Sequence, residues 1–303
     1  MPADFKAGFV AVVGKPNVGK STLMNALLGQ HVAAVSTKPQ TTRRNQLGIL
    51  SEGDFQVIFI DTPGLHQEHN KLGNLMNEQA LFALEDADVV MFLVDGSHSP
   101  TDEDRVLAAK LSSGRSQRPV LLALNKVDLL SPEGVGGRRA EYETLAETEQ
   151  TLEISALQGT GLPDLLAAII ERLPKGEAYY PSDQVTDAYE RQISADLIRA
   201  AAMGRLRDEV PFGIDVRIDR YVERGEQGAL IEATLFVERE SHKGIVIGEG
   251  GQMIKEIGKS ARKEIEAMSQ RKVFLDLRVK VKANWRDDET ALEQFGYRRR
   301  KEK

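Results

Sequence analysis

Cysteine is absent from the 303 residues of this chain, tryptophan occurs once, and aromatic residues make up only 6%. The lack of cysteine excludes disulfides and thiolate metal sites, and it is compatible with an intracellular protein. No apolar run approaches the ~18 residues of a membrane-spanning helix, and no charged-then-apolar leader opens the sequence. We therefore expect no export and no membrane span. A cytoplasmic location is predicted, with peripheral contact at the inner face of the cell membrane left open.

Charge is unevenly distributed along the chain. The formal net charge is −6, but residues 241–303 hold 16 lysines and arginines against 10 aspartates and glutamates. The C-terminal region is therefore basic, and the rest is strongly acidic. A basic region on an acidic protein predicts a polyanionic partner, with a solvated charged surface as the alternative. The length and the 41% hydrophobic content suffice for two domains.

One glycine-rich segment points to a phosphate ligand. Residues 14–21 read Gly-Lys-Pro-Asn-Val-Gly-Lys-Ser and match the phosphate-binding loop G-x-x-x-x-G-K-[S/T]. The apolar run Phe9–Val13 before it predicts a buried strand, and Ser21–Leu28 after it predicts a helix. In such a loop, N–H groups close around a polyphosphate, the lysine reaches the β- and γ-phosphates, and the hydroxyl binds Mg²⁺. The predicted phosphate-binding residues are Gly14, Asn17, Val18, Gly19, Lys20, Ser21 and Thr22.

A second motif selects the base. The apolar run Val120–Leu124 predicts a strand that ends in Asn125, Lys126 and, one residue later, Asp128. Asp128 can accept from the N1–H and the N2 amine of guanine, the Lys126 stem can lie over the ring, and Asn125 can brace the loop. Adenine would leave the carboxylate unpaired. The pattern predicts GTP or GDP, with a polar turn as the alternative. Backbone N–H groups of Ser155, Ala156 and Leu157 are further candidates, facing the guanine O6.

Two segments between these motifs supply candidate metal ligands. Phe55–Ile60 predicts a strand that leads into Asp61-Thr62-Pro63-Gly64. Asp61 would hold Mg²⁺ through water, and the Gly64 N–H would meet the γ-phosphate. Residues 36–46 are polar and non-periodic, which predicts a switch segment whose threonine binds Mg²⁺ only beside a γ-phosphate. Thr42 is favoured over Thr41, so the predicted metal ligands are Ser21, Thr42 and Asp61.

The second half of the sequence reads as a separate domain. Prolines and a glycine around residues 175–183 predict a linker. A helix is expected at about 185–207, and strands are expected at 214–218, 229–237 and 273–281; the last alternates apolar and polar residues and predicts a mostly basic outer face. The expected domains are residues 1–174 and 184–285, joined by linker 175–183 and followed by a basic tail, 286–303.

Two helices of this second domain are expected to flank Gly248-Glu249-Gly250-Gly251, which matches the G-x-x-G loop of a KH domain. Small residues let an RNA backbone approach, and the flanking helix dipoles favour phosphate. The predicted RNA-binding residues are Lys243, Ile245, Ile247, Gly248, Glu249, Gly250, Gly251, Ile254 and Lys255, with Val246 also expected in the groove. The fold class is α/β: a P-loop GTPase domain with a mostly parallel, doubly wound sheet, followed by an α+β type II KH domain.

The motifs Gly-Lys-Pro-Asn-Val-Gly-Lys-Ser, Lys-Pro-Gln-Thr-Thr-Arg and Asp-Thr-Pro-Gly-Leu together resemble the Era family of bacterial Ras-like GTPases. The resemblance spans nearly the whole chain. It implies hydrolysis of GTP with Mg²⁺, with Lys20, Thr42 and Gly64 as the catalytic residues. It also implies a partner, the 3′-end region of small-subunit ribosomal RNA on the small ribosomal subunit, and a role in ribosome assembly. A monomer is expected.

Two positions depart from common patterns. Leu65 stands where many GTPases carry a glutamine that orients the attacking water, so the resemblance implies slow hydrolysis of GTP. Several related GTPases use K⁺ as a positive charge near the phosphates, held partly by the residue that corresponds to Asn17. His66 is a weaker candidate for a catalytic group. Glu249 stands where Era-like sequences commonly have lysine, and a carboxylate repels RNA phosphate. The alternative to a GTPase is an RNA-binding chaperone whose nucleotide domain barely hydrolyses GTP. A third interpretation, a GTPase that acts at membranes, rests only on the basic tail.

Overall fold

The computed structural model describes residues 4–36, 38, 40–64, 70–113, 118–225 and 228–297. It divides into two compact units. The first comprises Met1–Gln30, Thr42–Gln67 and Asn77–Asp187, and the second comprises His31–Thr41, Glu68–Met76 and Ala188–Lys303. Two short N-terminal segments therefore belong to the C-terminal unit, which the sequence did not predict.

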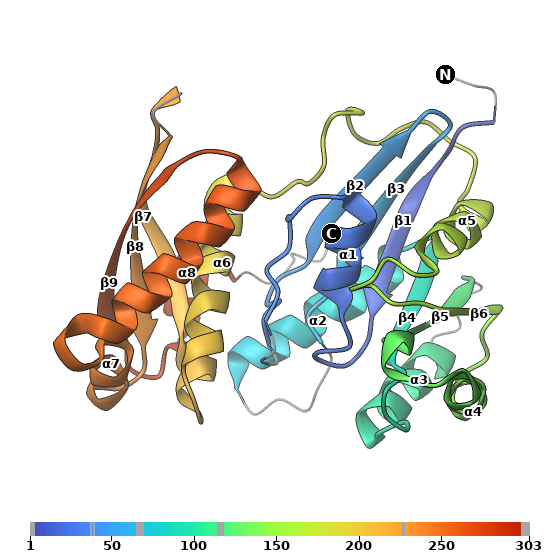
Figure 1. Cartoon of the computed structure of the whole chain (residues 1–303), viewed down its shortest axis with the longest axis horizontal. Coiled ribbons are helices and arrows are strands. Elements are labelled where there is room, and N and C mark those ends of the chain that lie inside the picture. The colour runs from blue at the N-terminus through green and yellow to red at the C-terminus, as the bar shows by residue number, and fades with distance from the viewer. Residues whose placement is uncertain are drawn as a thin grey trace. The chain divides into compact units, whose positions relative to one another are not determined.

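The first unit is built on a six-stranded sheet in the order β2-β3-β1-β4-β5-β6 (Figure 1). All neighbouring pairs are parallel except β2 and β3, which are antiparallel. The interior strands β3 and β4 are buried along their whole length, which explains their continuous apolar runs. The strands are β1 (Lys6–Val13), β2 (Gln46–Glu52), β3 (Phe55–Asp61), β4 (Val89–Asp95), β5 (Val120–Asn125) and β6 (Gln150–Glu153).

Helices connect the parallel strands, and each returns the chain to the edge of the sheet where the next parallel strand begins. They are α1 (Lys20–Leu28), α2 (Lys71–Asp86), α3 (Asp102–Ser113), α4 (Pro132–Glu143) and α5 (Leu162–Arg172). Because β1, β3, β4 and β5 run parallel, their carboxyl ends meet at one edge of the sheet. The loops that follow them carry the sequence motifs, and this edge is where open α/β sheets bind ligands.

The expected linker, 175–183, and the residues that follow it up to Asp187 belong to the first unit. The backbone N–H of Ile49 in β2 donates to the carbonyl of Val185 at 2.7 Å, and the Thr186 hydroxyl donates to the Leu47 carbonyl at 2.6 Å. Gln56 of β3 donates to the Tyr180 carbonyl at 2.8 Å. Residues after α5 therefore follow the outer strands of this sheet.

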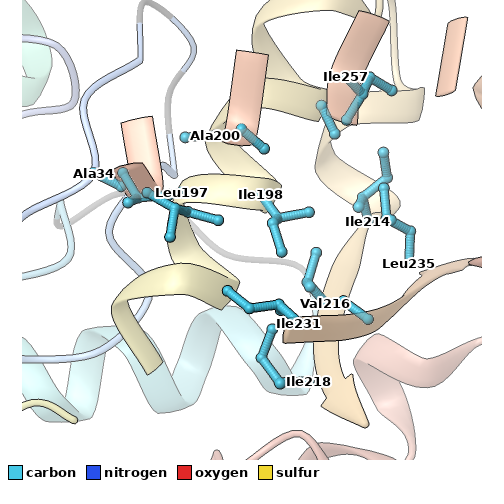
Figure 2. Packing of buried hydrophobic residues seen from close by; sticks show 14 of the residues in the cluster. Ala34, Leu197, Ile198, Ala200, Ile214, Val216, Ile218, Ile231, Leu235 and Ile257 are labelled. Carbon is cyan, nitrogen blue, oxygen red and sulfur yellow. The ribbon is translucent and has the colours of Figure 1, made fainter. Parts of the chain in front are cut away.

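The second unit has a three-stranded sheet in the order β7-β8-β9, with β7 antiparallel and β9 parallel to β8. Its strands are β7 (Asp215–Glu223), β8 (Ala229–Val237) and β9 (Val273–Val281), and its main helices are α6 (Glu190–Arg205), α7 (Glu240–Ile247) and α8 (Gln252–Ser269). This is the expected element order, although α6 begins later and β7 ends later than expected. Ile198, Ile231 and Ile257 are fully buried between sheet and helices (Figure 2).

The region expected to form a basic tail is folded up to residue 297. Trp285 is fully buried, and its indole N–H donates to the Gly213 carbonyl at 2.9 Å. The short helix α9 (Glu289–Gln294) is capped by Asp288, which accepts from the N–H groups of Thr290 and Ala291. Phe236 and Phe295 pack with Trp285 in an apolar cluster that also contains Leu72, Leu75 and Met76 of α2. Apolar residues of 286–297 therefore extend the unit beyond the expected boundary at 285, and residues 298–303 lie outside the described part.

Within the described residues, no helix combines the length and the apolar character needed to span a membrane.

Candidate functional site

The phosphate-binding loop leaves β1 at Val13 and enters α1 at Lys20, as its sequence predicts. Gly19 has φ +106°, and a Cβ there would lie 2.4 Å from the Asn125 amide nitrogen. At Gly14 a Cβ would lie 2.3 Å from the Leu93 carbonyl oxygen. Both positions therefore require glycine, and Asn17 at φ 65° completes a loop that can turn its N–H groups inward. Val18 is fully buried beside it, and Thr22 is half-buried on α1.

Lys20 is held inside this loop. Its side chain is buried, and its ammonium donates to the carbonyls of Gly14 and Lys15 at 2.8 and 3.0 Å. Burial lowers the pKa of Lys20 to about 8, against the opposing attraction of Asp61. A polyphosphate in the loop would raise this pKa again, because an adjacent negative charge favours the protonated lysine. The geometry therefore places a cation ready for phosphate at the N-terminus of α1.

The three predicted metal ligands converge, although they come from three segments. Oδ2 of Asp61 accepts from the Ser21 hydroxyl at 2.9 Å and from the Thr42 hydroxyl at 3.0 Å, and the two hydroxyls are 3.1 Å apart. Burial raises the pKa of Asp61, while Lys20, Ser21 and Thr42 oppose the shift. Oδ1 of Asp61 is buried without a hydrogen-bond partner. A buried carboxylate oxygen beside two hydroxyls is the oxygen-rich surrounding that suits Mg²⁺.

The Asp-Thr-Pro-Gly turn returns to the phosphate loop. The Thr62 hydroxyl donates to the Val12 carbonyl at 2.8 Å and is buried. A Cβ at Gly64 would lie 3.0 Å from Pro16, so glycine permits the close approach of these two loops. The structure thus brings Gly64 to the phosphate loop. Leu65 and His66 lie outside the described residues.

The predicted guanine-binding motif, Asn125 to Asp128, is hydrogen-bonded to the phosphate loop. The Asn125 amide donates to the Val18 carbonyl at 2.7 Å and accepts from the Ala156 N–H at 2.9 Å. Lys126, at φ 67°, donates to the Asn17 carbonyl at 2.9 Å. Asp128 is exposed at the end of the motif. The motif thus holds the loop through its first two residues and presents the third to solvent.

The segment Ser155-Ala156-Leu157 contacts Asn125. Its N–H groups were expected to face the guanine O6, but two of them donate to protein groups. The Ala156 N–H donates to Asn125, and the Ser155 N–H donates to the Thr160 carbonyl at 3.0 Å. A base at this position would therefore share these donors with the protein. The side chain of Leu157 is 78% exposed.

Sequence reasoning missed two acidic residues that support the site. Asp95, at the end of β4, accepts from Lys126 at 2.6 Å. Burial opposes the charged form of Asp95, but hydrogen bonds from Lys126 and Ser97 outweigh it and lower the pKa of this carboxyl. Asp104 of α3 is fully buried and accepts from Lys15 of the phosphate loop at 2.7 Å. The apolar run of β4 ending in an aspartate was a usable signal for Asp95, whereas nothing in the sequence pairs Asp104 with Lys15.

In the second unit, the predicted RNA-binding loop joins α7 to α8. Gly248, Gly250 and Gly251 all have positive φ, and a Cβ at Gly248 would lie 2.7 Å from that of Met253. The loop is exposed at Glu249 and Gly250, as a surface that receives a backbone must be. Helices flank the loop on both sides, as the sequence predicts, and α8 begins directly after it.

The side chains around this loop divide between groove and core. Ile245 is 48% exposed, and Ile247 and Ile254 are half-buried, so these three remain candidates for an apolar groove. Val246, expected beside them, is instead fully buried in the core. Helical periodicity explains this, because neighbouring residues of α7 face different directions.

The basic groups of this unit are partly neutralised by acidic neighbours. Lys243 pairs with Glu240 at 3.7 Å, whereas Lys255 is exposed on α8. On β9, Arg278 pairs with Asp276 at 3.3 Å, which reduces the basic character expected of that face.

Comparison with known proteins decides the family. Residues 9–126 match a family described as a 50S ribosome-binding GTPase, and residues 209–286 match the KH domain. The chain is 44% identical over 299 residues to GTPase Era of Halothermothrix orenii, covering 97% of this chain and 99% of that protein. This chain belongs to the Era family of GTPases.

Two solved Era structures share the fold at a TM-score of 0.91 and 38% identity, each covering 97% of this chain and 99% of the other. One is Era in complex with MgGDPNP and nucleotides 1506–1542 of 16S ribosomal RNA. The other is an Aquifex aeolicus Era variant bound to GDP·AlF4⁻. The Era family membership confirms the fold class expected from sequence, a P-loop GTPase domain followed by a KH domain.

Proposed function

We propose that this chain binds and hydrolyses GTP with Mg²⁺ and couples its nucleotide state to binding of small-subunit ribosomal RNA near the 3′ end, in small-subunit assembly. The observation that carries the proposal is the convergence of Ser21, Thr42 and Asp61 beside buried Lys20. The Era complex with MgGDPNP and 16S ribosomal RNA supports both ligands. The complex of the second Era with GDP·AlF4⁻ supports hydrolysis.

The residues of the phosphate loop divide the work of binding. Lys20 would neutralise the β- and γ-phosphates, and the N–H groups between Gly14 and Ser21 would surround them. Ser21 and Thr42 would hold Mg²⁺ directly, with Asp61 acting through water. When bound there, Mg²⁺ would supply positive charge beside the phosphates. The Gly64 N–H would meet the γ-phosphate, so Lys20, Thr42 and Gly64 are the proposed catalytic residues.

Guanine would be chosen at the other end of the site. Asp128 would accept from the base, and Lys126 would lie along it while it continues to hold Asn17. Because Asn125 bonds both the phosphate loop and Ala156, a change in this brace would disturb every part of the nucleotide site. K⁺ dependence through Asn17 stays a prediction, as do the monomeric state and membrane contact.

RNA would bind the surface formed by α7, the G-x-x-G loop and α8. Gly248 to Gly251 admit the backbone, and Ile245, Ile247 and Ile254 offer an apolar surface to unstacked bases. The nucleotide half of the proposal lies in residues 1–174, and the RNA half lies in the domain that begins after the expected linker 175–183 and packs as one unit up to residue 297. If nucleotide state changes RNA affinity, RNA must change the affinity for GTP relative to GDP by the same factor.

Single-turnover hydrolysis tests the nucleotide half of this proposal. The protein is mixed with excess Mg²⁺ and labelled GTP, with or without a synthetic RNA of nucleotides 1506–1542, in K⁺ or Na⁺ buffer. We expect slow hydrolysis that requires Mg²⁺. Turnover at the buffer rate under every condition would instead establish the RNA-binding chaperone.

A matched pair of loop variants tests the RNA half. Gly250 has φ 56°, and a Cβ there would meet open space; Asp and Asn both tolerate this conformation. Gly250→Asp adds a charge that Gly250→Asn lacks. We expect the Asp variant to lose most RNA affinity and the Asn variant to lose less, with intrinsic hydrolysis retained in both. Equal RNA affinity of the parent and both variants would remove the loop from the RNA site.

A further inference from the structure

The segment that precedes Thr42 is packed into the C-terminal unit. His31–Thr41 belongs to the same compact unit as α6. Ala34 of this segment is 6% exposed and joins the apolar cluster of Ile193, Leu197 and Ile198 on α6. Figure 2 shows Ala34 beside Leu197. The start of the segment His31–Thr41, just before the switch residues 36–46, is therefore part of a packed core.

A buried arginine of α6 holds the other end of this segment. Arg199 is 1% exposed, and its guanidinium donates to the Gln40 carbonyl at 3.1 Å and to Asp196 at 2.5 Å. Burial opposes the charged form, but Asp196, Tyr297 and Asp215 outweigh it and raise the pKa of Arg199. A buried charge is costly unless it is paired, and a planar fork with several donors can serve carboxylate and carbonyl together.

The backbone at this anchor has an unusual conformation. Gln40 has φ 64°, in the left-handed region that residues other than glycine seldom adopt. Thr41 then donates through its hydroxyl to the Lys38 carbonyl at 2.8 Å. The bond from Arg199 therefore fixes the direction of the chain as it leaves the C-terminal unit.

Thr42 follows two residues after the anchored carbonyl. Two residues span at most about 7 Å of extended chain, so the position of Gln40 limits where the Thr42 hydroxyl can lie. That hydroxyl is 3.0 Å from Asp61 and 3.1 Å from Ser21. Only Thr41 separates the anchored Gln40 from Thr42, so a short stretch of chain joins the anchor to the metal site.

We propose that Arg199 is a positioning residue for Thr42: by holding the Gln40 carbonyl it favours the arrangement in which the Thr42 hydroxyl reaches Mg²⁺. The inference rests on the proposed role of Thr42 as a ligand that acts with a γ-phosphate. Arg199 then raises affinity for GTP over GDP from within the C-terminal unit. A change that moves α6 relative to the segment changes that preference.

The test measures affinities of fluorescent GDP and of a non-hydrolysable GTP analogue, with Mg²⁺ and with EDTA. Arg199→Lys keeps a positive charge beside Asp196 but loses the planar fork. We expect affinity for the GTP analogue with Mg²⁺ to fall about five- to tenfold, the scale of one hydrogen bond, with GDP affinity unchanged. In EDTA the difference should vanish, because Thr42 acts through the ion.

Arg191→Lys is the matched control. Arg191 lies on the same helix and also donates to a backbone carbonyl, that of Ile218 in β7. This variant should leave the preference for GTP unchanged. The fluorescence of buried Trp285 reports whether each variant is folded. If Arg199→Lys does not fold, Gln40→Val replaces it, because a β-branched residue disfavours the left-handed backbone. It should weaken the GTP analogue selectively.

A double-mutant cycle with Thr42→Ala separates positioning from general structure. If Arg199 acts through Thr42, Arg199→Lys should add little in the Thr42→Ala background. Equal losses for GDP and GTP, or fully additive effects, overturn the proposal while leaving the proposed function intact. If Thr42→Ala itself leaves the preference unchanged, the role of Thr42 fails and the role of Arg199 fails with it.

Discussion

The phosphate loop and the G-x-x-G loop are both glycine turns that lead into a helix, yet they are supported in different ways. The phosphate loop is fixed by side chains from elsewhere in the chain: Asn125, Lys126 and Asp104 each bond it. The G-x-x-G loop is shaped by its own backbone and by the close contact of Gly248 with Met253. The phosphate loop is thus held by several side chains, whereas the G-x-x-G loop is an exposed surface.

This difference suits the two ligands. A small polyphosphate gains affinity from groups fixed before it arrives, because they lose little freedom on binding. A long single strand gains affinity from many weak contacts along its length. Single substitutions should therefore have large effects in the first loop and graded effects in the second. The four predictions that follow test this contrast in order of decreasing effect.

Lys20→Ala should have the largest effect. It removes the buried cation that we propose to face the β- and γ-phosphates, and a lost hydrogen bond to a charged group costs roughly 1.5–3 kcal/mol for each contact. We expect at least a ~100-fold loss of affinity for both GTP and GDP. Fluorescent nucleotide titration measures it, with Lys110→Ala, an exposed lysine of α3, as control. A folded variant that binds like the parent would show that the loop is not the phosphate site.

Asp128→Asn should exchange the base preference. Asparagine can donate an N–H to the C2 carbonyl of xanthine, whereas the proposed role of aspartate is to accept from the N2 amine of guanine. Each mismatch costs about 1–3 kcal/mol, so we expect GTP affinity to fall and XTP affinity to rise by roughly ten- to 100-fold. Competition by GTP, XTP and ATP against a labelled nucleotide measures the change. An unmoved preference, or ATP binding as tight as GTP binding in the parent, would exclude Asp128 as the guanine-reading residue.

Much of this architecture was predictable because motif and local pattern agreed. The run before Gly14 and the alternation of Val273–Val281 define strands on their own, and the structure has β1 and β9 there. Residues whose role depends on distant partners were not predictable. No motif or periodicity marks Arg199, Asp104 or Trp285 in the sequence. Only the fold brings them to their partners Gln40, Lys15 and Gly213.

The apolar segments near the C-terminus show the same limit. Their charge predicted a tail, but Phe295 and Tyr297 are buried in a cluster with Leu72. A short helix such as α9 has little stability alone, and tertiary packing decides whether it forms. Charge patterning reports on the surface and says little about aromatic residues that anchor a terminal segment.

The pH dependence of nucleotide binding should be a smaller effect with a definite sign. The pKa of Lys20 is lowered from 10.5 to about 8, so between these values the unfolded chain holds more protons than the folded one. Stability of the nucleotide-free chain should therefore rise with pH across this window. Binding of a polyphosphate favours the protonated lysine, so affinity should fall by up to about tenfold per pH unit above pH 8.

Lys20→Arg is the control for this pH effect, because arginine stays charged throughout the window. The guanine N1–H also ionises in alkaline solution, but it does so equally for parent and variant. The quantity to compare is the slope of log affinity against pH between about 8 and 9. Parallel slopes would show that Lys20 does not take up a proton on binding.

Glu249→Lys should have the smallest effect and tests the exposed loop. Glu249 lies between the glycines and is exposed, so its carboxylate would repel an RNA phosphate bound at this loop, with the repulsion screened by water. A surface charge pair is worth only about 0.2–1 kcal/mol, so reversal of the charge should tighten RNA binding by about two- to fivefold. Each added phosphate contact on a single strand should steepen the slope of log affinity against log salt concentration by about 0.7.

Glu249→Gln separates relief of repulsion from new attraction, because it should tighten RNA binding without steepening this slope. Binding of the synthetic RNA at several salt concentrations measures both quantities. If neither variant changes affinity or slope, Glu249 does not face the RNA, and the loop admits the backbone on its glycine side alone.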